Sequence, residues 1–281
     1  MDYVRWDDRP ALRRPVLIAA FEGWNDAGDA ATTAVRYLRD RWGAHAFASV
    51  DPEEFYDFSA TRPHVKLNAG LTREIVWPSN QLAWASLRPE GRDVVTLLGT
   101  EPQLKWRTFC EQLVGVVTEL DVEMVVVVGA LLADVAHTRP VRVTGSAATE
   151  ELATRLGLRR SRYEGPTGIV GVLQDALARA EVPSASLWAA VPHYVAGTPS
   201  PKAALALVQR ATSLISVPVV TADLAQLAAD YEQEVSEVVA SDEDVSAYVA
   251  RLEENTDSEG LELASGEELA AELQQFLRDQ G

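Results

Sequence analysis

The chain has 281 residues, of which 47% are hydrophobic and 24% charged, and its formal net charge is -17. This composition is typical of a globular protein and excludes a wholly disordered chain. The longest apolar run, 124–133, is about half of the roughly 20 residues that span a bilayer, and the acidic N-terminus has no secretory-type apolar segment, so we expect a cytoplasmic protein with no membrane partner.

Short apolar runs alternate with helical patterns along the first 216 residues. The strand-like runs lie at 15–21, 46–50, 93–98, 123–129, 141–144 and 186–191. The helical patterns lie at 26–42, 103–120, 147–156, 167–180 and 201–216. Most strands are nearly continuous in apolar residues, which is typical of strands buried on both faces. The order predicts an α/β fold with a mostly parallel or mixed sheet covered by helices on both faces.

Two further features lie within this region. Residues 64–77 alternate between apolar and polar side chains around Asn68 and Gly70, which predicts an antiparallel hairpin at an edge of the sheet. The single cysteine, Cys110, shares a helical stripe with Trp106 and Leu113. We therefore interpret Cys110 as a small core residue, and a lone cysteine fits a reducing compartment.

The C-terminal part differs in charge from the rest of the chain. Residues 223–281 carry a net charge of -15, which leaves -2 for residues 1–222. Apolar stripes at 224–238 and 245–252 predict two helices, and Ser265 with Glu268 marks the start of a third. We expect an α/β core domain at 1–222 and an acidic helical extension at 223–281. An acidic tail repels phosphate backbones, so nucleic acid is not an expected partner.

Polar, glycine-containing segments follow several predicted strands. In open α/β sheets, ligands bind in crevices outside the carboxyl ends of strands, because several loops converge there. One shared cleft for a polar small molecule is therefore predicted. Its candidate ligand-binding residues are Asn25, Asp26, Glu101, Glu164, Thr167 and His193.

Several of these candidates also have a purely structural interpretation. Asp26 and Asp29 can form a capping box at the start of a helix. Glu101 and Pro102 precede the helical pattern of Trp106 and can mark the start of that helix.

The segment around Thr167 offers two interpretations of the same kind. Gly165 and Pro166 occupy cap and first-turn positions, so the Thr167 and Gly168 amides either begin a helix or hold an oxyanion. His137 and His193 are proton carriers or satisfied structural histidines. The chain contains no HExxH, CxxC or GxSxG motif. We therefore expect no metal site and no cofactor, and the catalytic residues stay unknown.

Five segments in order resemble the bacterial branch of the proteasome assembly chaperone 2 family. They are FEGWNDAGDAA at 21–31, GTEPQLKWRTF at 99–109, GALLADVAHTRP at 129–140, YEGPTGIVGVL at 163–173 and VPHYVAGTPSPKA at 191–203. The resemblance covers about residues 15–220. It implies a three-layer α/β/α core, similar to phosphorylase and peptidyl-tRNA hydrolase folds, and self-association, with a trimer as the expected homo-oligomer.

The resemblance also bears on partners. Eukaryotic relatives assist the assembly of proteasome α-rings, and some archaeal relatives dock on proteasomes through a C-terminal hydrophobic-tyrosine-any-residue tail. This chain ends in Arg278, Asp279, Gln280 and Gly281, so that docking signature is absent, and proteasome docking through such a tail is not expected. The favoured function is a noncatalytic assembly or interaction protein. The alternative is a small-molecule-binding protein or enzyme, nucleoside-phosphorylase-like or hydrolase-like, that uses the strand-end cleft.

Overall fold

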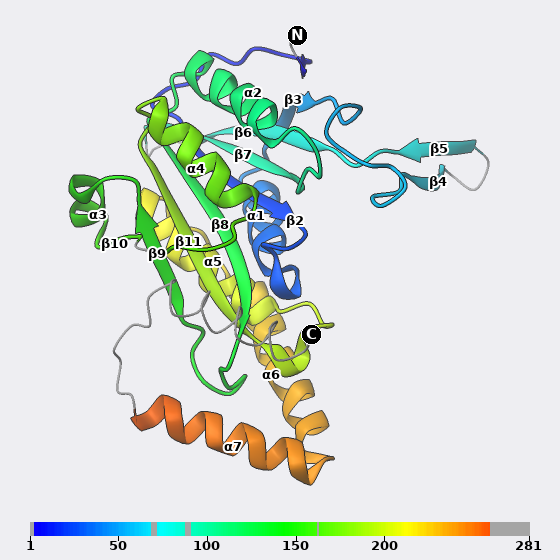
Figure 1. Cartoon of the computed structure of the whole chain (residues 1–281), viewed down its shortest axis with the longest axis vertical. Helices are drawn as coiled ribbons and strands as arrows, with labels where there is room; N and C mark the ends of the chain where they lie inside the picture. The colour runs from blue at the N-terminus through cyan, green and yellow to red at the C-terminus, as the bar shows by residue number, and fades with distance from the viewer. Residues whose placement is uncertain (1–2, 69–71, 88–90, 162, 259–281) are drawn as a thin grey trace.

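A mixed nine-stranded sheet runs through the centre of the molecule (Figure 1). The computed structural model describes residues 3–68, 72–87, 91–161 and 163–258. In spatial order the strands are β1 (Val4–Trp6), β3 (His45–Val50), β6 (Asn80–Leu87), β7 (Arg92–Thr100), β2 (Val16–Glu22), β8 (Met124–Ala133), β11 (Ser184–Pro192), β9 (Val143–Ala147) and β10 (Arg159–Arg160). The four central strands, β7, β2, β8 and β11, are parallel, and antiparallel strands flank them on both sides.

The central strands are buried on both faces, as their continuous apolar runs predict. Alternate residues of β2 belong to two different cores: Leu17 packs with Phe109 and Leu173, whereas Ile18 packs with Leu38 and Leu207. Successive side chains of a strand point to opposite faces of its sheet. The sheet is therefore the middle layer of a three-layer α/β/α fold, which confirms the predicted fold class.

Helices cover the two faces of the sheet. One face packs against α1 (Ala30–Arg41), α3 (Glu150–Leu156) and α5 (Pro201–Ile215), and the other against α2 (Trp106–Glu119) and α4 (Ile169–Arg179). The short helices η1 (Ala27–Asp29) and η2 (His193–Val195) follow β2 and β11. Cys110 lies in α2 and is buried, which confirms its interpretation as a core residue, and burial raises the pKa of its thiol to about 12.

The predicted hairpin forms, but its predicted place at an edge of the sheet is wrong. Strands β4 (His64–Asn68) and β5 (Thr72–Val76) pair antiparallel with each other in a separate two-stranded sheet. The pair projects from the body as an arm (Figure 1). The alternating pattern reports that two neighbouring strands pair, but it carries no information on which further strand they join.

Two helices follow the α/β body, as the apolar stripes predict. α6 (Ala222–Ala240) packs along α5, and α7 (Glu243–Ser258) follows it. Leu224 joins the core on the α5 side of the sheet, whereas Tyr231, Val235 and Leu252 form a separate cluster with Ala136. The third predicted helix lies outside the described residues, and the domain division at residue 222 stays a prediction. Within the described part of the chain, no helix is long and apolar enough to cross a membrane.

Candidate functional site

The loop after β2 is held between its neighbouring strands at the carboxyl edge of the sheet. The amide of Glu101, just after β7, donates a 2.8 Å hydrogen bond to the carbonyl oxygen of Glu22. On the other side, the amide of Ala130 in β8 donates to the carbonyl oxygen of Asn25, also at 2.8 Å. These bonds fix residues 22–26 at the edge where β2, β7 and β8 meet.

Asp26 caps the first helix, although not through the predicted capping box. Its Oδ1 accepts hydrogen bonds from the Ala31 amide at 2.6 Å and the Thr32 amide at 3.2 Å, and its Oδ2 accepts from the Thr32 hydroxyl. Asp29 is itself the N-cap of α1, in a left-handed backbone conformation (φ 48°), and its side chain makes no cap bond. The expected partnership of Asp26 with Asp29 is therefore wrong, and Asp26 instead binds the Ala31 and Thr32 amides and the Thr32 hydroxyl.

Burial governs the charge of Asp26. The residue is 5% exposed, and loss of solvent raises the pKa of its carboxyl to about 6, against the lowering effect of its bonds to Thr32 and Ala31. A buried carboxylate close to neutral pH can hold or release a proton. The same burial carries a stability cost whenever the group is ionised.

The Glu101 carboxylate binds the start of α4 (Ile169–Arg179), a helix that is distant from it in the sequence. Its Oε1 accepts hydrogen bonds from Asn25 Nδ2 and from the Ile169 amide, both at 2.8 Å. Helix α2 instead begins at Trp106, after Lys105 in the N-cap position. The expectation that Glu101 begins the Trp106 helix is therefore wrong, because the carboxylate reaches across to α4, 68 residues further along the chain.

Helix α4 also begins later than predicted. Its N-cap is Gly168 and its first residue is Ile169, so the cap and first-turn roles predicted for Gly165 and Pro166 are wrong. The positive end of a helix attracts an anion, and here the Glu101 carboxylate supplies one. A Cβ atom on Gly168 would lie 2.5 Å from Asn25 Oδ1, so only glycine permits this close packing.

The structure brings some of the six predicted site residues together. Asn25, Asp26 and Glu101 are neighbours at the carboxyl edge, and the exposed Thr167 directly precedes Gly168. Glu164 is exposed. His193 has a different set of contacts: its Nδ1 lies 3.0 Å from Asp134 Oδ1, and its ring is near Tyr194 and Tyr248. The single cleft shared by all six residues stays a prediction.

Two apolar side chains are exposed at the same edge. Trp24 follows β2 and Leu104 follows β7, and both are about half exposed. Gly23 has φ 124°, a backbone conformation that L side chains rarely adopt, and a Cβ atom at this position would lie 3.3 Å from the Glu101 Cβ. The turn at Gly23 thus leads the chain past Glu101 to Trp24.

A polar network surrounds His137, on the loop after β8. The His137 amide donates to the Tyr194 hydroxyl at 2.8 Å, so the hydroxyl hydrogen is free to donate to His137 Nδ1, also at 2.8 Å. The ring is then neutral with its proton on Nε2, which donates to Ser236 Oγ at 3.0 Å. Ser236 in turn donates to the Glu232 carbonyl oxygen at 2.7 Å. Both ring nitrogens of His137 therefore have partners within the protein, as its structural interpretation predicts.

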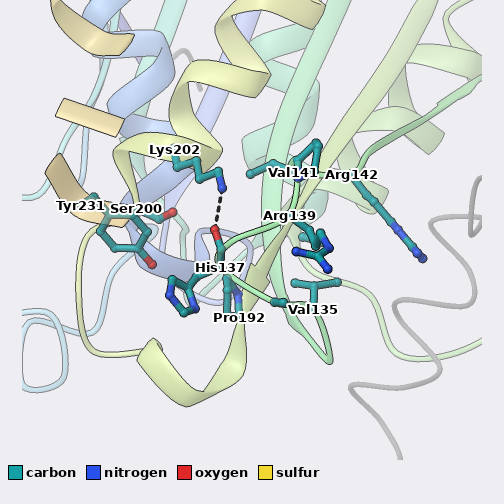
Figure 2. Close-up of a pocket in the computed structure, with 12 residues that line it drawn as sticks. Val135, His137, Arg139, Val141, Arg142, Pro192, Ser200, Lys202 and Tyr231 are labelled. Atoms are coloured by element: carbon teal, nitrogen blue, oxygen red, sulfur yellow. Dashed lines mark hydrogen bonds between the residues drawn. The ribbon is translucent and has the colours of Figure 1, made fainter. Parts of the chain in front are cut away.

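This network joins the body to α6. Lys202 donates from its Nζ to the His137 carbonyl oxygen (Figure 2). The same Nζ also donates to the Glu232 carboxylate. Burial lowers the pKa of His137, and the charge of Lys202 lowers it further. Sequence reasoning noted His137 but missed its partners, because Tyr194 and Ser236 are 57 and 99 residues away. No local pattern connects residues at such separations.

The hollow beside His137 is small. Figure 2 shows its lining, which includes Arg139, Ser200, Lys202 and Tyr231. Its volume is about 10 Å³, roughly the room that one water molecule requires. In the part of the chain that the structure describes, no three histidine, cysteine or carboxylate side chains are grouped to hold a metal ion.

Comparisons with known proteins give a consistent assignment. The model of the PAC2 family matches residues 20–239 and so extends into α6. A crystal structure of a PAC2 family protein from Streptomyces avermitilis is 48% identical, with a TM-score of 0.79 over 84% of this chain and 99% of that chain. The crystal structure of a Mycobacterium tuberculosis proteasome-assembly chaperone homologue is 46% identical, with a TM-score of 0.76 over 83% of this chain and 99% of that chain.

More distant structures share the fold alone. A Pyrococcus furiosus archaeal proteasome activator is 17% identical, with a TM-score of 0.66 over 84% of this chain and 97% of that chain. A comparison with curated proteins gave no match.

Proposed function

This chain belongs to the PAC2 family, and from that premise we propose that it is a cytoplasmic, noncatalytic interaction protein that assists the assembly of a protein complex. The carboxyl edge of its sheet is the proposed contact surface for the partner. The edge combines an internally bonded polar layer with exposed apolar side chains, and this combination suits contact with a protein.

The observation that carries the proposal is the arrangement around Glu101. Its Oε1 already accepts from Asn25 and from the first amide of α4, so the chain itself occupies the position that an anionic ligand would take. Trp24 and Leu104, in contrast, remain exposed at the same edge. Tryptophan is among the residues that contribute most to binding when a partner buries them.

The proposed partner is a proteasome subunit. The M. tuberculosis relative, 46% identical, is described as a proteasome-assembly chaperone homologue. At this identity, over 83% of the chain, the carboxyl-edge surface is expected to be used in a similar way. The proposed partner surface does not depend on a C-terminal docking tail, so the ending Arg278 to Gly281 does not argue against it.

Co-expression with the proteasome α and β subunits of the same organism tests the proposal. We expect the tagged chain to co-purify with α subunits and to change the yield of assembled rings on native gels. Trp24→Ala combined with Leu104→Ala should weaken co-purification about tenfold or more, since each truncation removes an exposed apolar contact. Val220→Ala is a matched control, because Val220 is also an exposed apolar residue but lies between α5 and α6.

Two outcomes would overturn the proposal. One is unchanged ring assembly and no co-purification with the unmodified chain. The other is a thermal-shift screen in which a nucleoside or amino acid stabilises the protein and Asp26→Asn abolishes the effect. The second outcome would favour the small-molecule alternative.

A further inference from the structure

The β4–β5 arm has one apolar face that no described part of the chain covers. In an antiparallel pair, residues directly opposite each other lie on the same face. Val65 pairs with Ile75 and Leu67 pairs with Arg73, so these four side chains share a face. Val65, Leu67 and Ile75 are 62%, 59% and 56% exposed. An isolated two-stranded hairpin is only marginally stable in water, so a partner that covers this face would stabilise the arm.

Helix α6 presents a surface with complementary features. Its buried residues, among them Tyr231 and Val235, face the body. Leu227, Asp230, Glu234 and Val238 follow each other at spacings of three and four, so they form one stripe along the helix. All four are exposed. The stripe therefore has apolar residues at both ends and two carboxylates between them.

The arm and the stripe match in length and in charge. Five strand residues extend over about 14 Å, and the eleven steps from Leu227 to Val238 extend over about 17 Å. On the arm, Arg73 lies beside the apolar residues of the same face. The Arg73 guanidinium can lie between the two carboxylates of the stripe while Leu67 and Ile75 reach one of its apolar ends, which gives electrostatic and apolar complementarity together.

We propose that the apolar face of the β4–β5 arm of one copy of this chain docks on the Leu227–Val238 stripe of α6 of a second copy. The arm projects from the body on one side, and α6 lies toward the other end of the long axis (Figure 1). The two surfaces differ, so the contact is head-to-tail, and successive copies close into a ring when the rotation between them permits.

Disulfide cross-linking between differently tagged, co-expressed copies tests the contact directly. One copy carries Leu67→Cys and the other carries Leu227→Cys or Val238→Cys. The only native cysteine, Cys110, is buried and does not compete. We expect a linked pair that contains both tags with at least one of the two α6 variants.

Lys66→Cys is the matched control. Lys66 pairs with Glu74 and so lies on the opposite face of the arm, one residue from Leu67 along the same strand. It should give about tenfold less of the mixed pair, because its side chain points away from the second copy. Equal cross-linking from Lys66→Cys and Leu67→Cys, or none from either, would overturn the proposal.

Charge exchange provides a second, independent measurement by light scattering. Arg73→Glu and Glu234→Arg should each raise the dissociation constant of the oligomer roughly tenfold, and the double variant should recover most of the loss. A monomeric wild-type chain at micromolar concentration, or an oligomer unaffected by Leu67→Asp with Ile75→Glu, refutes the contact. Trp24 and Leu104 are intact in all these variants, so this failure is distinguishable from failure of the proposed partner surface.

Discussion

The replacement Asp26→Asn tests whether the buried carboxylate costs stability at neutral pH. The Asn side chain keeps an oxygen for the Ala31 and Thr32 amides, and its Nδ2 can donate to the Thr32 hydroxyl. It removes only the charge. We therefore expect the capping geometry to survive and the cost of burying a negative charge to disappear.

The size of the effect follows from the pKa. The folded-state pKa of Asp26 is about 6, against an ordinary value of 3.8, and each pH unit corresponds to about 1.4 kcal/mol. The folded protein therefore binds the proton more tightly, and wild-type stability falls as pH rises from 3.8 to about 6. Above that window the full cost, roughly 3 kcal/mol as an upper bound, applies, and at about pH 5 roughly half of it applies.

Urea unfolding at about pH 5 and about pH 7.5 measures the difference. Asp26→Asn should raise the free energy of unfolding at both pH values, with the larger gain at the higher one. Asp26→Ala should be less stable than Asp26→Asn by about 0.5 to 2 kcal/mol, because it also loses the cap. A variant Asp26→Asn that is less stable than wild type by the same amount at both pH values would refute the reasoning.

Two further predictions concern the His137 network and the packing at Gly168. Because burial lowers the folded-state pKa of His137 below its ordinary 6.5, the stability it supports is complete above pH 6.5 and decreases as pH falls below it. The hydrogen-exchange protection of α6, corrected for the slower intrinsic exchange at lower pH, should therefore decrease at about pH 5.5, and Tyr194→Phe should decrease it already at neutral pH. Gly168→Ala should lower the free energy of unfolding by about 1 to 3 kcal/mol, since its Cβ would collide with Asn25, whereas Gly43→Ala, with no neighbouring atom within 4 Å, should show only the strain of its positive φ.

Features that depend on neighbouring residues are the ones that the sequence predicts well. The continuous apolar run of β2 predicts a strand buried on both faces, because burial on both faces requires apolar residues at successive positions. The cap at Asp26 is also predictable, since its partners are five and six residues away. Strand β6 was not predicted, because Gln81 and Trp84 interrupt its run of buried residues. Its own sequence pattern also does not indicate that it pairs with β3 and β7.

Contacts between distant segments set the limit of prediction at the candidate site. The Glu101 carboxylate satisfies the start of α4, 68 residues away, while its own sequence neighbours suggest a role at α2. Only the sheet order, with β7 beside β2 and α4 on the α2 side, brings that carboxylate within reach. The sequence thus identifies the polar residues of the edge but not which of them are already satisfied.

Helix α6 is tied to the body on one side and carries the proposed docking stripe on another. One of its faces is tied to the body through the Ser236 contact with His137 and the Glu232 contact with Lys202. Its exposed stripe is the proposed docking surface for the arm of the next copy. A rigid helix holds both sets of residues in a fixed relation, so disruption of the His137 network displaces the stripe as well. Tyr194→Phe should therefore weaken self-association even though Tyr194 lies outside the proposed contact, whereas Trp24→Ala should leave self-association unchanged.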